Sequence, residues 1–182
     1  MTTILGISTS HDGTLSVLKD GQHIFSIAEE RLSRIKGNIG FPFLAFEYVV
    51  NEGIVDPKDV TTIAVAQAEF HVGTNRSLEF EYARDKIYYD LQNDPKPDGY
   101  KISSPQFKGC KSAEEVAERL KSVVQSIVAK VGIKAEVVLV DHHLSHAAAV
   151  YYASETEDPL IVTLDGEGDG LSGSISVAEK GR

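Results

Sequence analysis

The chain has 182 residues, a formal net charge of −9 and a single cysteine. A chain of this length buries on the order of 70% of the surface that its unfolded form exposes, so it can build its own core. The acidic balance argues against a protein that binds nucleic acid through the phosphate backbone. The apolar runs are far shorter than the roughly 20 residues of a membrane span, and one thiol forms no internal disulfide. We therefore expect a cytoplasmic protein without a membrane partner.

The first 29 residues predict three strands. Residues 2–8 form a short apolar run, Asp20-Gly21 lies between alternating apolar segments, and residues 23–28 alternate again. An Asp-Gly pair in that setting is typical of a tight hairpin. We therefore expect an antiparallel meander over residues 2–29.

Helices and buried strands alternate after the meander, which predicts an α/β fold with a mixed sheet in the order β-β-β-α-β-α-β-α. The periodicity and the capping residues predict a helix over 42–53, a strand over 60–66, a helix over 112–132, a strand over 135–140, a helix over 142–153 capped by Asp141, and a strand over 160–164 that ends at Asp165. The last strand, helix and strand are typical of a crossover unit, whose two strands lie parallel in one sheet. Residues 70–111 have no sustained period and indicate an insertion.

The end of the chain is similar to its beginning. ILGIS at residues 4–8 is followed by Asp12-Gly13, and IVTLD at residues 161–165 is followed by Asp169-Gly170. We expect a first lobe over residues 1–157 and the first two strands of a truncated second lobe over residues 158–182, although two unrelated strand-turn-strand units would look the same. Edge strands exposed over residues 171–178 would favour a homodimer.

The densest group of chemically reactive side chains lies at residues 141–146, DHHLSH. On a helix, His142 and His146 share one face, with Cβ atoms roughly 5 to 6 Å apart, so both imidazoles can hold one transition metal ion. His143 points elsewhere. Asp165 follows on the next strand, close enough to converge with the two histidines on one divalent ion and leave coordination positions open. Chance pairing of surface histidines is the alternative.

Carboxylates and glycines alternate at the end of the last buried strand. Glycines let a backbone approach a phosphate closely, and carboxylates can hold a cation. A glycine-rich hairpin with solvated acids is the structural alternative. By this reasoning the candidate cofactor-binding residues are Gly166, Gly168, Asp169 and Gly170, together with Asp12 and Gly13 in the similar turn near the start of the chain.

Two further residues are candidates for catalysis. His11 lies in the first-copy turn, beside Asp12, where a histidine can act as acid or base; a plain turn residue is the alternative. The run from Glu29 to Gly37 is rich in charge, which usually marks a solvated face. Leaving the third strand, Arg34 and Lys36 can instead reach a phosphate oxygen.

Four segments together resemble the N-terminal part of the O-carbamoyltransferase family, which includes nodulation protein U and antibiotic-tailoring carbamoyltransferases. In chain order they are ILGISTSHDG at residues 4–13, AEERLSRIK at 28–36, DHHLSHAAAVYY at 141–152 and LIVTLDGEGDG at 160–170. The resemblance implies an actin-like ATPase fold of two ribonuclease-H-like lobes. It also implies transfer of a carbamoyl group from carbamoyl phosphate, with ATP and through carbamoyladenylate, to a hydroxyl of a small-molecule acceptor.

The resemblance also implies roles for particular residues. His142, His146 and Asp165 match the metal-binding positions of the family, with iron as the expected ion, while His11 and Lys36 match positions tied to carbamoyl transfer. Because most of a second lobe is missing, we expect the fragment alone to be inactive and to bind metal weakly. The competing functions are an actin-like kinase or ATPase lobe and a non-catalytic module that binds metal or nucleotide.

Overall fold

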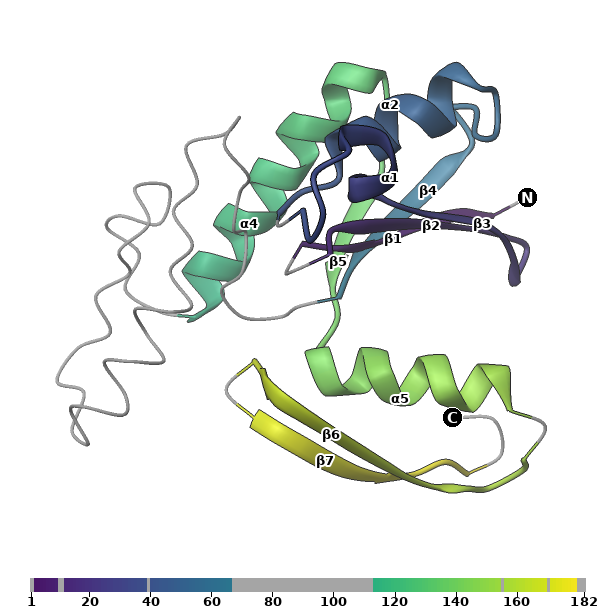
Figure 1. Cartoon of the computed structure of the whole chain (residues 1–182), viewed down its shortest axis with the longest axis vertical. Helices are drawn as coiled ribbons and strands as arrows, with labels where there is room; N and C mark the ends of the chain where they lie inside the picture. The colour runs from purple at the N-terminus through teal and green to yellow at the C-terminus, as the bar shows by residue number, and fades with distance from the viewer. Residues whose placement is uncertain are drawn as a thin grey trace, which may run out of the picture.

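The computed structural model describes residues 2–9, 12–38, 40–66, 113–154, 156–169 and 171–179 (Figure 1). The whole of the predicted insertion over 70–111, together with His11 and Gly170, lies outside the described residues. Within that part of the chain, no helix has both the length and the apolar character needed to cross a bilayer.

A five-stranded mixed sheet forms the larger part of the fold. Strands β1 (Thr3–Ser8), β2 (Thr14–Lys19) and β3 (Gln22–Ala28) pair antiparallel, so the predicted meander is confirmed. Strands β4 (Val60–Val65) and β5 (Glu136–Leu139) extend it with parallel pairing, in the order β3-β2-β1-β4-β5. The predicted α/β class and mixed sheet are therefore confirmed.

One face of this sheet carries the main core. Helices α1 (Glu29–Ser33), α2 (Phe43–Asn51) and α4 (Ala113–Val128) lie on it (Figure 1). Alternate strand residues point into the core, and Leu5, Leu15 and Ile63 are among those fully buried there against α2 and α4. A short 3₁₀ turn η2 (Ala129–Val131) ends α4 at Gly132, whose φ of 81° suits a residue without a Cβ.

The charge pattern of the run after β3, residues 29–37, suggested a solvated face. In the structure only part of the run is exposed. It begins with α1, which was not predicted, and Glu29 is only 6% exposed. Its two carboxylate oxygens accept the backbone N–H groups of Leu44 and Ala45, each at 3.0 Å. Glu29 thus satisfies two donors at the start of α2, which has no cap of its own.

The end of the chain forms a smaller unit. Helix α5 (His142–Ala153) packs on the antiparallel hairpin of β6 (Leu160–Gly168) and β7 (Leu171–Val177) through Ala147, Ile161 and Ala178 (Figure 1). The predicted crossover is wrong, because β6 pairs with β7 in a separate two-stranded sheet rather than with β5. Pairing across a tight turn closes a much shorter loop than a return to the larger sheet. Strand β6 also continues past Asp165, with an irregularity in register between Leu164 and Gly168.

Candidate functional site

Helix α5 presents two histidines to the hairpin. The predicted cap is present, because the Asp141 carboxylate accepts the backbone N–H of Leu144 at 2.8 Å. This cap starts the helix at His142, which places His142 and His146 one turn apart on the same face.

The structure brings His142, His146 and Asp165 together, as the sequence predicted. The Nε2 atom of His142 lies 2.7 Å from Oδ2 of Asp165 and 3.0 Å from Nε2 of His146. The Nε2 atom of His146 lies 3.5 Å from the same carboxylate oxygen. Three ligand-type atoms from two elements therefore meet at one point.

The carboxylate of Asp165 is held in its ionised form. The hydrogen bond from the His142 ring, assisted by the backbone N–H of Gly166, lowers the pKa of Asp165 to about 2. Both interactions favour the charged carboxylate. The site therefore combines two imidazoles with one fixed negative charge.

Asp169 and Gly168 hold the His142 end of the helix in place. The carboxylate of Asp169 accepts the backbone N–H of His142 at 2.7 Å, so it supports the start of α5 from the hairpin turn. A Cβ at Gly168 would overlap the His142 ring, whereas one at Gly166 would meet nothing within 4 Å. The sequence predicted that a phosphate approaches the backbone closely at these glycines. At Gly168, the group that lies close to the backbone is the His142 ring.

His143, which the sequence only placed on another face, is buried between α5 and the hairpin. Its Nε2–H donates to the carbonyl oxygen of Leu171 at 2.9 Å, and its Nδ1 lies 2.9 Å from Oγ1 of Thr163. Thr163 also contacts the hydroxyl of Ser174 at 2.8 Å. The available signal was Thr163, a polar residue in the otherwise apolar run over residues 160–164.

Asp12, Gly13 and Lys36 lie in loops beside the larger sheet. Gly13 donates its backbone N–H to the carbonyl of Asn38 at 2.9 Å, and a Cβ there would overlap the carbonyl of Gly40. Asp12 precedes it with a φ of 61°, and Lys36 is exposed in the loop after α1. Among the described residues, no hydrogen bond or ion pair joins Lys36 to the histidines of α5. The predicted roles of Lys36 and His11 stay predictions.

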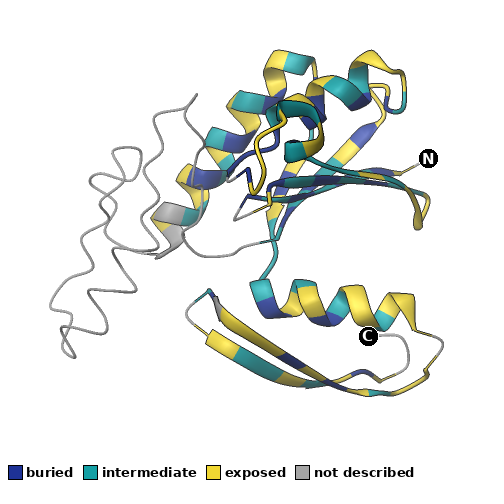
Figure 2. Cartoon of the chain, in the orientation of Figure 1, coloured by how far each residue is buried: buried dark blue, intermediate teal, exposed yellow. Residues whose placement is uncertain are grey.

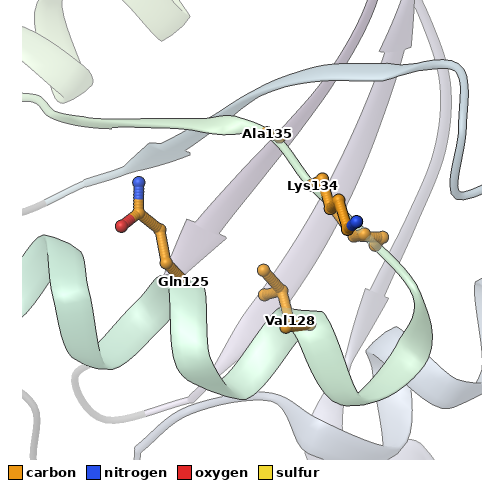
Figure 3. A pocket seen from close by; sticks show the side chains of 6 residues that line it. Gln125, Val128, Lys134 and Ala135 are labelled. Carbon is orange, nitrogen blue, oxygen red and sulfur yellow. The ribbon is translucent and has the colours of Figure 1, made fainter.

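A hollow of about 400 Å³ lies elsewhere, between α4 and the segment that enters β5. Figure 3 shows Gln125 and Val128 from the helix facing Lys134 and Ala135. Its lining is mostly apolar and holds none of the histidines or carboxylates described above. The candidate chemistry therefore lies at the α5 histidines and not in this hollow.

Comparison with known families gives one match over nearly the whole chain. The family model described as "Carbamoyltransferase N-terminus" matches residues 3–182. All of the candidate site residues fall inside that range.

Curated relatives match the chain over most of its own length. Nodulation protein NolNO of Sinorhizobium fredii is 29% identical over 92% of this chain, and an uncharacterised protein of Synechocystis is 28% identical over 96% of it. An uncharacterised protein of Methanocaldococcus jannaschii is 25% identical over 97%. The chain spans only 21%, 27% and 25% of the lengths of these three relatives, in the same order.

Among solved structures, YeaZ from Pseudomonas aeruginosa aligns with 98% of this chain and 66% of its own. The TM-score is 0.38 and the sequence identity is 11%. A second structure, of a protein from the same organism described as similar to peptidase YeaZ, aligns with a TM-score of 0.36 and 13% identity, over 98% of this chain and 67% of its own.

Proposed function

Because the chain belongs to the carbamoyltransferase family, whose N-terminal domain it matches over residues 3–182, we propose that it supplies the metal centre of an enzyme that carbamoylates a hydroxyl of a small molecule. The observation that carries this proposal is the convergence of His142, His146 and Asp165, whose ligand atoms all lie within 4.8 Å of one another. The carbamoyl donor would be carbamoyl phosphate, activated with ATP through carbamoyladenylate.

The residues fit a divalent metal ion. Neighbouring ligands of an octahedral ion lie about 3.0 Å apart when their bonds are about 2.1 Å long. The three separations in the chain, 2.7, 3.0 and 3.5 Å, bracket that value. Two histidines and one carboxylate with open positions are typical of ferrous iron, so iron is the proposed ion. When bound, it would act as a Lewis acid that anchors phosphate oxygens.

The chain's own residues prepare this centre. Asp165 supplies the negative charge that a cation requires, since an aspartate is ionised at neutral pH and the His142 contact lowers its pKa further. Asp169 holds the start of α5, and Gly168 leaves room for the His142 ring. We further propose that His11 transfers a proton and that Lys36 stabilises charge on the carbamoyl oxygen. The turn at Asp12-Gly13 and the backbone around Gly166 and Gly170 would lie against the nucleotide phosphates.

The proposed enzyme is larger than this chain. Because the chain spans about a quarter of its relatives' length, we propose that it binds but does not turn over its substrates on its own. We also propose an actin-like first lobe over residues 1–157 and the start of a second lobe over residues 158–182. The small core that α5 shares with the hairpin contains residues from both sides of this boundary, so the two parts pack on one another there.

Calorimetric titration with carbamoyl phosphate tests this function. The iron-loaded chain is expected to bind carbamoyl phosphate, and the heat of binding should disappear after chelation and in His142→Ala. A kinase or ATPase lobe would instead bind ATP with magnesium equally well in the wild type and in His142→Ala. A chain that binds iron but neither phosphate compound would be a non-catalytic metal module.

A further inference from the structure

We propose that His143 is a positioning residue, which sets the register of α5 on the hairpin and so places His142 and His146 over Asp165. The proposal rests on the metal site proposed above, and it concerns how this chain builds that site. His143 itself offers no free ring nitrogen to an ion, because both nitrogens already have partners.

His143 joins one helix to both strands of the hairpin. It is only 1% exposed, it contacts Thr163 on β6 through Nδ1, and it contacts the carbonyl of Leu171 on β7 through Nε2. A buried polar group that is satisfied at both ends strongly disfavours displacement, because moving it would leave unpaired polar atoms away from water. A shift of α5 along the hairpin would break both contacts.

The hydrogen bonds form an ordered chain. A carbonyl only accepts, so Nε2 of His143 carries the proton that Leu171 receives, and Nδ1 of the neutral ring accepts the hydroxyl proton of Thr163. The Oγ1 atom of Thr163 in turn accepts from the backbone N–H of Ser174 at 2.9 Å and from its hydroxyl at 2.8 Å. Thr163 and Ser174 are also direct partners in the β6–β7 register. The network therefore connects the helix to the pairing of the two strands.

The network adjoins the candidate ligands on both elements. Thr163 lies two residues before Asp165 on β6, and side chains two apart share a face of a strand. On α5, the ring of His143 meets the ring of His142 edge-on, with centroids 5.3 Å apart. The distance between the histidines and Asp165 therefore depends on the His143–Thr163 contact.

The other packing between α5 and the hairpin is less directional. The apolar cluster there consists of Ala147, Ile161 and Ala178, with Tyr151 at its margin. Contacts of small apolar groups stabilise burial without selecting one register. The bond from the backbone N–H of His142 to Asp169 fixes one end of the helix only. His143 is the residue that fixes the part of α5 between His142 and His146 on the hairpin.

Four variants of the 182-residue chain test the proposal. Thr163→Val removes the hydroxyl with little change of shape, and His143→Phe removes both nitrogens but keeps a ring. His143→Asn keeps a polar atom at the position of Nδ1 and serves as the rescue. Ile161→Val is the matched control, since it weakens the same interface without touching the hydrogen bonds.

Two readouts separate positioning from general stability. In the metal-free chain, NMR measures the cross-relaxation between the ring of His142 on α5 and the α protons of Gly168 on β6, against which that ring lies. In the cobalt-loaded chain, titration measures the dissociation constant, and visible absorption reports the ligand geometry. Supporting residues of this kind typically change metal affinity by about 10- to 100-fold.

The expected result is loss of the His142–Gly168 signal and at least about tenfold weaker cobalt binding in Thr163→Val and His143→Phe, with partial recovery in His143→Asn. Ile161→Val should lower the unfolding temperature but retain both readouts. The proposal would be overturned if the His142–Gly168 signal and the affinity were unchanged in folded Thr163→Val and His143→Phe, or were lost equally in Ile161→Val. If the wild type bound no cobalt while the His142–Gly168 signal still depended on His143, the metal function would fail and the positioning role would stand.

Discussion

Asp165 is the residue whose ionisation most directly reports the histidine contact. In the metal-free chain its pKa of about 2 comes mainly from the His142 hydrogen bond. His142→Ala should therefore raise that pKa toward the ordinary value of 3.8. Because the folded pKa is lowered, the stabilisation is present above about 3.8 and disappears as the pH falls through about 2.

A ¹³C NMR titration of the Asp165 carboxyl carbon measures this shift. His23→Ala, which changes a histidine on β3 in the other sheet, is the control and should leave the midpoint in place. The same midpoint in His142→Ala as in the wild type would mean that the ring contact does not hold the carboxylate in its ionised form.

The two glycines beside Asp165 provide a second comparison at the residue scale. A methyl group at Gly168 would overlap the His142 ring, so Gly168→Ala should cost about 1–3 kcal/mol of unfolding free energy and weaken metal binding. Gly166→Ala meets open space and should stay within about 0.5 kcal/mol of the wild type. Urea denaturation of both variants checks this. Equal losses would show that the His142 ring does not lie against Gly168.

At the scale of elements, Glu29 connects α1 to the start of α2. Its carboxylate replaces the missing cap of α2, and loss of a cap typically costs about 1 kcal/mol. Glu29→Ala should therefore lower the unfolding free energy by about that amount in urea denaturation. Glu52→Ala, at the exposed C-terminal end of the same helix, is the control. No difference between the two variants would show that the cap contributes nothing.

Burial opposes the charge on the same carboxylate. It raises the pKa of Glu29, although the two backbone N–H groups and Glu47 also act on it, the former lowering the pKa and the latter raising it. The cap therefore combines a favourable pair of hydrogen bonds with the desolvation of a carboxylate.

Local sequence patterns predicted most helices and strands, but they did not predict contacts between residues far apart in the sequence. The meander follows from Asp20-Gly21, and α5 follows from Asp141, because turns and caps are formed by neighbours in the sequence. The pairing of β6 with β7 rather than β5 was missed, since an apolar run specifies a strand without specifying its partner. Glu29 was missed for a related reason, because its partners lie 15 and 16 residues away.

The candidate site was likewise predicted where it depends on local spacing and missed where it depends on distant contacts. The spacing of His142 and His146 predicts a shared face, and Asp165 follows at the next strand, so these three were found from the sequence. The role of His143 was not, because its partners Thr163 and Leu171 are 20 and 28 residues distant. Only the folded hairpin brings them to the helix.

At the scale of the whole molecule, the outer face of the hairpin is exposed and apolar (Figure 2). Leu164 is 86% exposed and Ile175 is 74% exposed, and Val162 is the cross-strand partner of Ile175. An apolar sheet face with open edges favours association. We therefore expect sedimentation velocity to show a concentration-dependent homodimer.

Replacing the cross-strand pair tests this surface. Val162→Lys with Ile175→Lys should shift the chain to the monomer, since lysine disfavours pairing on an exposed strand face. Gln22→Lys with Gln125→Lys changes the net charge equally at exposed sites elsewhere and should leave the association unchanged. Equal effects of the two pairs would indicate that net charge, and not the hairpin face, controls association.

The metal centre is the claim on which the proposed function depends most directly. The measurement is the iron content of the purified chain after anaerobic loading, beside the double variant His142→Ala, His146→Ala and the control His23→Ala. We predict iron in the wild type and in His23→Ala, and its loss in the double variant, because that variant removes two of the three converging ligands. Equal iron in the double variant and the wild type would contradict the assignment of the site.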